Sequence, residues 1–484
     1  MPPADDNAGK HHAFAQGKTK VRTKVFNGIQ PVVPAEYGDS EAFRFHRESD
    51  PLGRDLRNAG NPHPILWFRV CHVTNDILMR FYFKLYVKPN MRTELKSKLA
   101  KRMAGVQGEA AFETLARANE LERQGRHIIH LEIGEPDFDT PAPIVTAGIE
   151  WLKQGKTHYA PVAGVPELRE AVARRLSTRH NVKVESANVL ISPGAKLMIF
   201  AVIHSLIDPG DEVIYPCPVY PAYESAVTMA GATPVPIVLE ESKEFRFSLE
   251  TLAARITPRT RMIVINTPQN PTGGVLTLDD LKAIGDLARK HDLLILSDEI
   301  YSEIFYDEPP ASMLDVPNIM DRLILVSGFS KTYAMTGWRI GYGVIPTDLL
   351  PAVNLFMNSS VSSTSTFCQL AAVEAFTAES TLSVQRMVEE FRRRRDVFVD
   401  GLNDIAGIHC LRPHGAFYLF PNISALGRSS REIADRLLNE AGVAALPGTA
   451  FGKYGEGYLR FSFANSLTNI EAALDRIRTF ASRL

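Results

Sequence analysis

The sequence predicts an α/β fold in which a mostly parallel sheet is covered by helices on both faces, joined to a smaller α/β domain formed by both chain ends. Two observations lead to this fold class. Between about residues 140 and 370, short apolar runs alternate with amphipathic segments of helical periodicity. Each apolar run also ends at a polar or glycine-rich turn. Strands that alternate with helices favour a parallel sheet that is buried on both faces.

The individual elements follow from these patterns. Apolar runs at 212–215, 261–265, 293–296 and 323–326 are predicted to be buried strands. Residues 166–176 have apolar side chains at three- and four-residue spacing, which predicts a helix, and Pro166 suits its first position. Further helices are expected at 197–206 and at 380–402. In sheets of this kind ligands bind beyond the carboxyl ends of the strands.

The division into domains follows from a change in composition along the chain. Residues 1–90 are rich in Pro, Gly, Asn, His and Asp and are predicted to be a largely disordered extension. Within it, 65–88 could form a strand or a short helix. Met91 opens a helical stretch, and a true start of the chain at Met91 is left open. We expect a large domain at 141–370 and a small domain from 91–140 and 371–484.

Composition limits the possible functions. The 484 residues carry a formal net charge of -1, so no overall field attracts nucleic acid or an anionic membrane. No apolar run is long enough to cross a bilayer, and the N-terminus lacks the order of a secretory signal. The four cysteines are scattered without a CxxC pair, which argues against a disulfide framework and a zinc site. We therefore predict a cytoplasmic protein without a metal site, a nucleic-acid partner or a membrane partner.

The most informative segment is 327–341, which reads SGFSKTYAMTGWRIG. It places Lys331 among small and hydroxyl residues, with Arg339 eight positions later. A lysine amine can condense with an aldehyde cofactor, and an arginine can hold a phosphate by a two-pronged contact. The alternative is an exposed lysine and arginine in an ordinary loop.

This segment is similar to the lysine attachment signature of class I/II aminotransferases, enzymes of fold type I that depend on pyridoxal 5'-phosphate (PLP). Through Ala334–Arg339 it most resembles the aspartate aminotransferase subgroup. The similarity extends from about residue 91 to the C-terminus. It implies that Lys331 holds PLP and that Arg339 holds the phosphate.

The resemblance assigns three residues to the cofactor ring. Asp298 would bond the ring nitrogen, and Tyr301 and Asn270 would bond the ring 3'-oxygen. The Asn270–Pro271 bond is expected to be either cis or trans, with cis directing the side chain inward. Without the resemblance, Asp298 is equally well explained as the cap of a following turn, and 266–273 as a plain loop.

The resemblance also assigns the phosphate loop and the stacking ring. The backbone amides of Ala195 and Lys196 would hold the phosphate, and Gly194 would allow close approach of the chain. Lys196 has two alternatives, a contact with a substrate's distal carboxylate and a solvated surface position. Tyr220 is expected to stack on the ring, with Tyr223 as the alternative and core packing as a third possibility.

Three further residues are implied to bind substrate or to reach a second subunit. Arg460 lies in an alternating apolar run, where an arginine is costly unless paired, and would receive the substrate α-carboxylate. Its alternative is a structural salt bridge. Gly134 would meet the same carboxylate through its backbone, together with Asn270. Tyr159 would reach the partner subunit's phosphate, which implies a homodimer with shared sites. Ordinary turns are the alternative for Gly134 and Tyr159.

One position departs from the family pattern. Many relatives carry a phosphate-binding serine three residues before the lysine, where this chain has Gly328. Ser330 is the expected substitute, with a further hydroxyl at Ser327, or the phosphate does without this bond.

The resemblance predicts transfer of an amino group from an L-amino acid to a 2-oxo acid, with substrates of the aspartate and 2-oxoglutarate kind. The freed Lys331 amine would act as general base and acid. The alternatives are a PLP-dependent carbon–sulfur lyase or decarboxylase-like relative, and the aminotransferase-like domain of a transcription regulator. No helix-turn-helix pattern is evident in the N-terminal extension.

Overall fold

The fold was analysed in a computed structural model that describes residues 98–106 and 108–484. All of these residues belong to one compact unit that begins at Pro89. The expectations for residues 1–90, and the helical stretch from Met91, lie outside the described residues. Within the described residues, no helix combines the length and the apolar character that crossing a bilayer requires.

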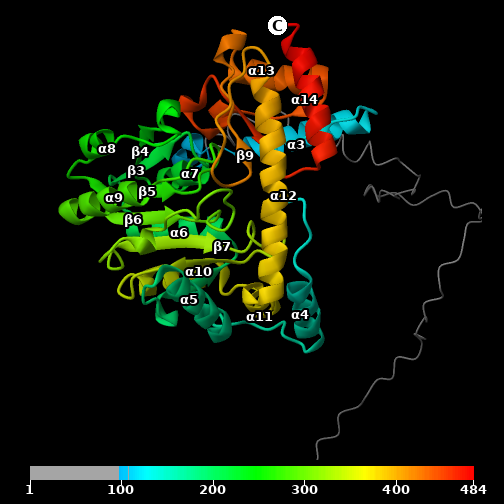
Figure 1. The fold of residues 1–484 in the computed structure, drawn as a ribbon. Helices are drawn as coiled ribbons and strands as arrows, with labels where there is room; N and C mark the ends of the chain where they lie inside the picture. The colour runs from blue at the N-terminus through cyan, green and yellow to red at the C-terminus, as the bar shows by residue number, and fades with distance from the viewer. Residues whose placement is uncertain (1–97, 107) are drawn as a thin grey trace, which may run out of the picture. The chain divides into compact units, whose positions relative to one another are not determined.

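A seven-stranded sheet forms the centre of this unit, in the order β2-β8-β7-β6-β5-β3-β4 (Figure 1). Neighbouring strands from β4 to β7 run parallel, whereas β8 is antiparallel to both β7 and β2. The sheet is therefore mostly parallel, as predicted. Its strands are β2 (Val189–Ser192), β3 (Glu212–Cys217), β4 (Thr233–Val238), β5 (Thr260–Asn266), β6 (Leu294–Asp298), β7 (Leu323–Gly328) and β8 (Gly341–Val344).

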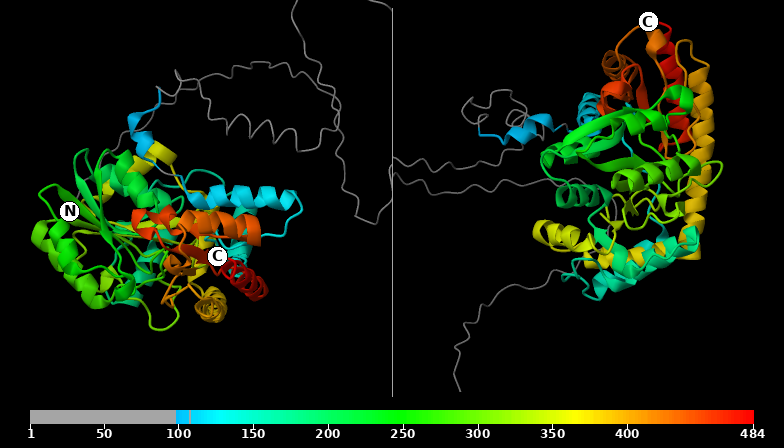
Figure 2. Two further views of the ribbon diagram at one scale, coloured as in Figure 1. Left: turned by 90° about the horizontal axis from the view of Figure 1, so that it is seen from above. Right: turned by 90° about the vertical axis from the view of Figure 1, so that its left-hand side faces the viewer.

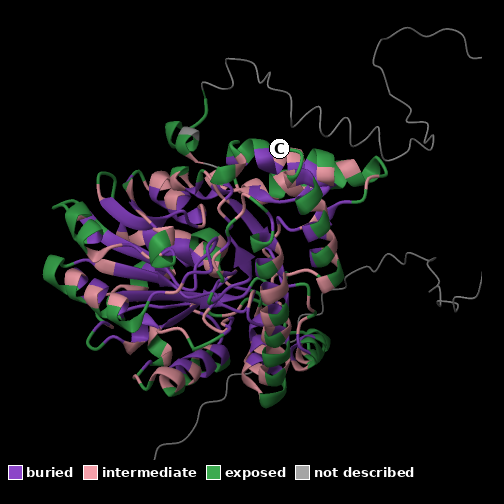
Figure 3. Ribbon diagram, turned by 45° about the horizontal axis from the view of Figure 1, so that its top comes forward, coloured by how far each residue is buried: buried purple, intermediate pink, exposed green. Residues whose placement is uncertain are grey.

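Helices cover both faces of this sheet, because the strands are apolar on both sides. Along β5, Met262 and Val264 pack in one hydrophobic cluster, while Ile263 and Ile265 pack in another. The first cluster includes α6, α7 and α10, and the second includes α4, α5, α8, α9 and α11. Figure 2 shows the sheet with helices beside it in two further views, and Figure 3 shows that its strands are buried while the outer helices are partly exposed. These helices are α4 (Ala142–Lys153), α5 (Pro166–His180), α6 (Ala195–Leu206), α7 (Ala222–Met229), α8 (Leu249–Arg255), α9 (Leu278–His291), α10 (Leu350–Val361) and α11 (Thr366–Ala372).

A separate hydrophobic cluster joins segments from both ends of the described chain. Ile129 and Leu131 pack there with Phe391 and Phe398 of α12 (Ala378–Asn403) and with Phe461. Figure 1 shows α12 running beside the large sheet and up to α14. The domain limits at 140 and 370 stay a prediction. The remaining elements are α3 (Ala110–Arg123), β1 (Ile129–His130), β9 (Tyr418–Leu419), α13 (Ser430–Arg436), β10 (Val443–Ala444), β11 (Leu446–Pro447), β12 (Leu459–Ser462) and α14 (Leu467–Ala481).

The strands and helices predicted within the described residues are all present, with boundaries that differ by a few residues. The helix predicted at 166–176 continues to His180, where Asn181 adopts a left-handed conformation with φ of 48° and ends it. Sequence patterns gave no signal for β2, β4 or β8. The strand β8 reads Gly-Tyr-Gly-Val, which lacks the β-branched, apolar character of a typical strand, and tertiary pairing alone defines it.

Candidate active site

A cavity of about 460 Å³ lies beyond the carboxyl ends of β3, β5, β6 and β7. This is the edge of a parallel sheet where ligands are expected. The structure brings most of the predicted site residues together in its lining. Those that line it are Gly134, Ala195, Lys196, Tyr220, Asn270, Asp298, Tyr301, Ser330, Lys331, Arg339 and Arg460.

Lys331 follows the end of β7 by three residues and extends its amine into this cavity. The Nζ atom donates a hydrogen bond to the carbonyl oxygen of Gly134 at 2.5 Å. Burial lowers the pKa of the Lys331 amine to about 8. This value already includes the charge of Glu135, which raises the pKa, and the positive charges of Arg460 and Arg339, which lower it. The amine is therefore a weaker base and more often neutral than an exposed lysine.

Asp298 is the last residue of β6 and is buried, and each of its two carboxylate oxygens accepts one hydrogen bond. Its Oδ2 accepts a hydrogen bond from the Tyr223 hydroxyl at 2.6 Å, and its Oδ1 accepts one from the Ile300 amide at 3.1 Å. The second contact is the turn cap that the sequence left open. Burial raises the pKa of Asp298 to about 6, while the hydrogen bond from Tyr223 lowers it. A cationic group facing this carboxylate would relieve the cost of its buried charge.

Asn270 lies in the loop after β5, and its peptide bond to Pro271 is cis. The loop is fixed by Asn266, whose Oδ1 accepts a hydrogen bond from the Asn270 amide at 3.0 Å and whose Nδ2 donates to the Asp298 carbonyl at 3.0 Å. The Asn270 Oδ1 atom is buried and has no hydrogen-bond partner among the described residues. A buried amide oxygen of this kind is normally satisfied by a ligand or water.

Tyr301 lies beside Asn270 in the cavity lining, but its hydroxyl contacts a residue that the sequence did not indicate. The Tyr301 and Tyr418 hydroxyls lie 2.8 Å apart, and both rings are buried. Tyr418 belongs to β9, and its ring lies 4.7 Å from the Arg460 guanidinium carbon. It links the predicted ring-oxygen residue to the predicted substrate arginine.

The start of α6 forms an open anion site. Gly194 precedes the helix with φ of 88°, and no side chain caps its free backbone N–H groups. The positive φ favours glycine at this position, where a Cβ atom would also lie 2.4 Å from Nη2 at the end of the Arg339 side chain. Arg339 donates to the carbonyl oxygens of Thr336 and Pro193 at 2.8 and 3.4 Å, and Ser330 lines the same cavity.

Gly328 has a structural explanation. A Cβ atom there would lie 3.0 Å from the Gly341 Cα and 3.1 Å from the Ile340 carbonyl oxygen, because β7 and β8 approach closely at this point. The Ser327 hydroxyl donates to the Glu299 carbonyl at 3.2 Å and does not line the cavity. Of the two hydroxyls that the sequence offered, only Ser330 is placed to meet a ligand.

Arg460, on β12, is buried and donates through Nη2 to the carbonyl oxygen of Glu132. Its Nε atom is buried and has no hydrogen-bond partner among the described residues. Burial lowers the pKa of this guanidinium. A buried guanidinium with a free donor is suited to bind a carboxylate.

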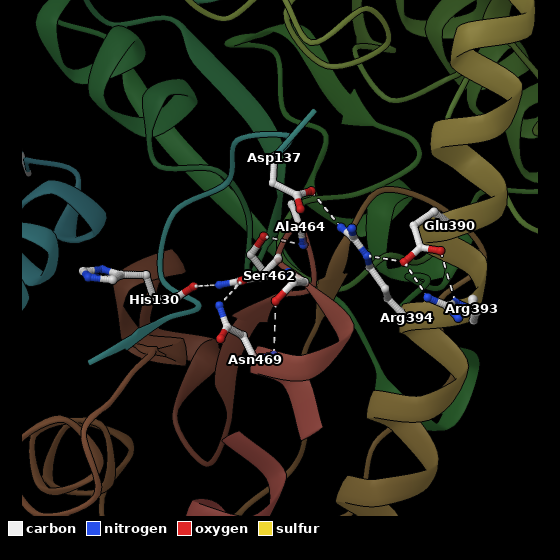
Figure 4. A network of polar contacts seen from close by, with 10 residues as sticks. His130, Asp137, Glu390, Arg393, Arg394, Ser462, Ala464 and Asn469 are labelled. Carbon is white, nitrogen blue, oxygen red and sulfur yellow. Dashed lines mark hydrogen bonds and ion pairs between the residues drawn. The ribbon is translucent and has the colours of Figure 1, made fainter. Parts of the chain in front are cut away.

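The loop that carries Gly134 is tied to α12 by a polar network (Figure 4). Arg394 of α12 donates to Asp137 at 2.7 Å and to Glu390 at 3.0 Å. Its guanidinium carbon also lies 5.0 Å from the centre of the Phe138 ring. This buried arginine fixes the loop whose carbonyl oxygen meets Lys331.

Tyr220 and Tyr223 have different positions in the site. The Tyr223 hydroxyl is held by Asp298, whereas the Tyr220 hydroxyl donates to Glu109 at 2.9 Å. The two rings meet edge to face with centroids 5.9 Å apart. Both line the cavity, but Tyr223 is buried and Tyr220 is partly exposed, so Tyr220 is the ring that a flat ligand can contact.

Two predicted residues do not line the cavity. Gly194 lies just behind it, at the cap of α6. Tyr159 lies in a separate surface hollow with residues 363–367, and its side chain is 88% exposed. It does not contribute to the site of its own chain.

Sequence reasoning missed several polar residues that line the cavity, among them Glu109, Asn266 and Tyr418. Asn266 immediately precedes the Thr-Pro-Gln-Asn turn and could have been found, because a polar residue ending a buried strand is unusual. Glu109 and Tyr418 carried no local signal. They reach the cavity only through tertiary packing.

These observations define a class of protein: an α/β enzyme with a reactive lysine in a cavity that also contains an uncapped helix start, a buried carboxylate and a buried arginine. The uncapped N–H groups at the start of α6 fit a phosphate, and the buried Asp298 carboxylate fits a protonated ring nitrogen, so the residues suit a flat, phosphate-bearing cofactor such as PLP.

Comparison with known proteins gives the family. A model of the family "Aminotransferase class I and II" matches residues 126–477. The chain is 40% identical over 355 residues to an aspartate aminotransferase of Pyrococcus abyssi, covering 73% of this chain and 91% of the relative. It is 41% identical over 353 residues to aromatic-amino-acid aminotransferase 2 of Thermococcus litoralis, covering 72% and 90%.

Solved structures agree. The aspartate aminotransferase of Thermus thermophilus with maleate superposes with a TM-score of 0.76 at 38% identity, covering 79% of this chain and 99% of that chain. The chain belongs to the class I and II aminotransferase family. It is an aminotransferase of the α/β fold type I, as its sequence predicted.

Proposed function

We propose that this aminotransferase binds PLP through Lys331 and moves the amino group of an L-amino acid to a 2-oxo acid. The observation that supports this most is the Lys331 amine, which lies in the cavity with its pKa lowered to about 8. Family members generally depend on PLP, which supplies an aldehyde for the amines and an electron-withdrawing ring that stabilises negative charge at the substrate Cα.

Other residues of the cavity would each bind a different part of the cofactor. The amides at the start of α6, the Arg339 guanidinium and the Ser330 hydroxyl would bind the phosphate. Asp298 would accept a hydrogen bond from the ring nitrogen, and Asn270 and Tyr301 would bond the ring oxygen. Tyr220 would lie against the ring face. Tyr223 would hold Asp298 in position through their hydrogen bond.

The chain's own residues carry the proton. When its amine is free, the Lys331 Nζ atom would take the proton from the substrate Cα and later return it. Its hydrogen bond to the Gly134 carbonyl oxygen supports this role, because Gly134 lies in the loop proposed to border the substrate. Arg460 would bind the substrate α-carboxylate, and Asn270 and the Gly134 backbone would border it.

We propose substrates of the aspartate and 2-oxoglutarate kind. Relatives named for aspartate and for aromatic amino acids are about equally similar to this chain. Lys196 is the cavity-lining cation to which no other role is assigned, so it is the residue that could contact a distal carboxylate. The test is a panel of amino donors assayed with 2-oxoglutarate.

A carbon–sulfur lyase is the alternative that this assay separates. A lyase turns over a single amino acid without a second 2-oxo acid, whereas the proposed reaction stops after one half unless the acceptor is added. The visible absorbance of a lysine-bound PLP, present in the purified protein and absent after Lys331→Ala, tests the cofactor itself. Turnover unchanged by Lys331→Ala would overturn the proposal.

We also propose a homodimer in the cytoplasm. The exposed ring of Tyr159 supports a contact with a second subunit, because it is 88% exposed in a single chain. Three of the four cysteines are free and buried, as expected in a reducing compartment. Sedimentation of the purified protein tests the dimer, and a monomer at micromolar concentration would contradict it.

A further inference from the structure

The far end of the cavity contains a carboxylate that the proposed reaction does not use. Glu109 precedes α3 and accepts a hydrogen bond from the Tyr220 hydroxyl at 2.9 Å. It also forms an ion pair with the Lys196 ammonium group. Although Glu109 is the N-cap residue of α3, its side chain makes no capping hydrogen bond. The carboxylate is directed into the cavity instead of toward its own helix.

Glu109 is close enough to Lys331 and Arg460 to influence their pKa values. Its negative charge raises the pKa values of the Lys331 amine and the Arg460 guanidinium. Ala110 and Ala111, which follow it, line the cavity and pack against the core of the large sheet. The side chain is therefore held at the cavity by its neighbours, with 25% of its surface exposed.

Of the positively charged side chains named above that line the cavity, all but that of Lys196 have a proposed role in binding the cofactor or the substrate. The proposed function, on which this inference rests, uses Lys331 and Arg339 for the cofactor and Arg460 for the substrate α-carboxylate. Lys196 is then the cavity-lining cation left for a carboxylate at the far end of a substrate. In this chain its ammonium group is already neutralised by Glu109.

We propose that Glu109 determines substrate specificity, as a tethered carboxylate that occupies Lys196 in place of the side-chain carboxylate of a dicarboxylic substrate. Aspartate, glutamate or 2-oxoglutarate must break this ion pair or place a second carboxylate beside it, and like charges at short range repel. A substrate with an uncharged side chain meets neither cost. Glu109 thus weakens the preference for dicarboxylates that a free Lys196 would give, so that the site also accepts amino acids with uncharged side chains.

The test is Glu109→Gln, which keeps the size of the side chain and removes its charge. Half-reactions of the PLP-loaded enzyme with aspartate alone and with phenylalanine alone avoid the dicarboxylic acceptor. We expect the ratio of the two kcat/KM values, aspartate over phenylalanine, to rise about tenfold, an amount typical of one charged contact. The Kd of maleate, an unreactive dicarboxylate, is expected to fall by a similar factor in calorimetry.

Two further variants make the result specific. Glu113→Gln removes the same charge from an exposed position on the same helix, away from the cavity, and should leave the ratio and the maleate Kd as they are. Lys196→Met removes the ammonium group and leaves the Glu109 carboxylate without its partner, so the ratio should fall below that of the wild-type enzyme, and an unchanged ratio would mean that Lys196 does not contact the dicarboxylate.

The outcomes separate this inference from the proposed function. A ratio that stays constant or falls in Glu109→Gln, or a maleate Kd that rises, overturns the role of Glu109. Absence of a half-reaction with any amino acid in the wild-type enzyme overturns the proposed function instead. In that case the maleate Kd of the two proteins still decides whether Glu109 and a dicarboxylate compete for Lys196.

Discussion

Replacing Glu135 with glutamine is expected to make the Lys331 amine a still weaker base. Among the charges around this amine, Glu135 is the largest that favours its protonated form. Burial and the guanidinium groups of Arg460 and Arg339 favour the neutral form. Removing the carboxylate leaves the more weakly acting Glu109 to oppose these three effects, so the pKa of Lys331 should fall below about 8. Arg460→Met should shift it in the opposite direction.

The size of the effect in the unmodified protein follows from the lowered pKa. Only a neutral amine attacks an aldehyde. At about pH 7.5, roughly a quarter of an amine with a pKa of about 8 is neutral, against about one part in a thousand for an ordinary lysine. The site therefore makes Lys331 about 200-fold richer in its reactive form than an exposed lysine at that pH.

The assay is pulse labelling of the cofactor-free protein with an amine-reactive reagent across the pH range, with each lysine quantified by peptide mass spectrometry. Lys183 is an internal reference, because its side chain is 84% exposed and its partner Glu185 raises its pKa. Labelling of Lys331 is expected to reach half its maximum near pH 8 and labelling of Lys183 above pH 10. Comparing midpoints removes the difference in access between the two amines.

Two results would refute the reasoning. A Lys331 midpoint equal to that of Lys183 would mean that burial does not weaken the amine. A midpoint that rises in Glu135→Gln would mean that this carboxylate does not stabilise the ammonium form.

Three other perturbations have expected outcomes. Lys331→Met should increase the free energy of unfolding of the cofactor-free protein near neutral pH by up to about 3 kcal/mol in chemical denaturation. A lysine with a lowered pKa destabilises the folded protein at pH values below that pKa, so the gain should vanish as pH rises from about 8 to about 10.5. A gain independent of pH would contradict this prediction. Asp298→Asn should lower kcat by about 10²-fold to 10³-fold. Because the pKa of Asp298 is raised, its contribution to the free energy of unfolding is fully present below about pH 4 and is lost as pH rises through about 6, by up to about 3 kcal/mol. Cofactor-free Asp298→Asn should not show this loss when denaturation is measured at a series of pH values. Arg460→Lys should lower kcat/KM for every amino donor by about 10-fold to 100-fold, since an ammonium group cannot make the two-pronged contact, and an equal value for both enzymes in steady-state assays would contradict the assigned role.

Local sequence patterns were sufficient for most of the large sheet. Buried parallel strands such as β5 and β6 are continuous apolar runs, and the residues that end them, Asn266 and Asp298, stand out because they are polar. The strand β8 could not be predicted, since its two glycines give it no strand propensity. Its existence depends on pairing with β7 and β2, which are distant in the sequence.

By itself, then, the sequence determined the fold class, the family and the residues that lie next to strand ends, because in a parallel sheet those ends share one edge. The tertiary structure alone decided which partners these residues have. Tyr418 reaches Tyr301 across 117 residues of chain, and Glu109 reaches Lys196 across 87. Contacts over such separations depend on how whole elements pack, and no local pattern of residues encodes that packing.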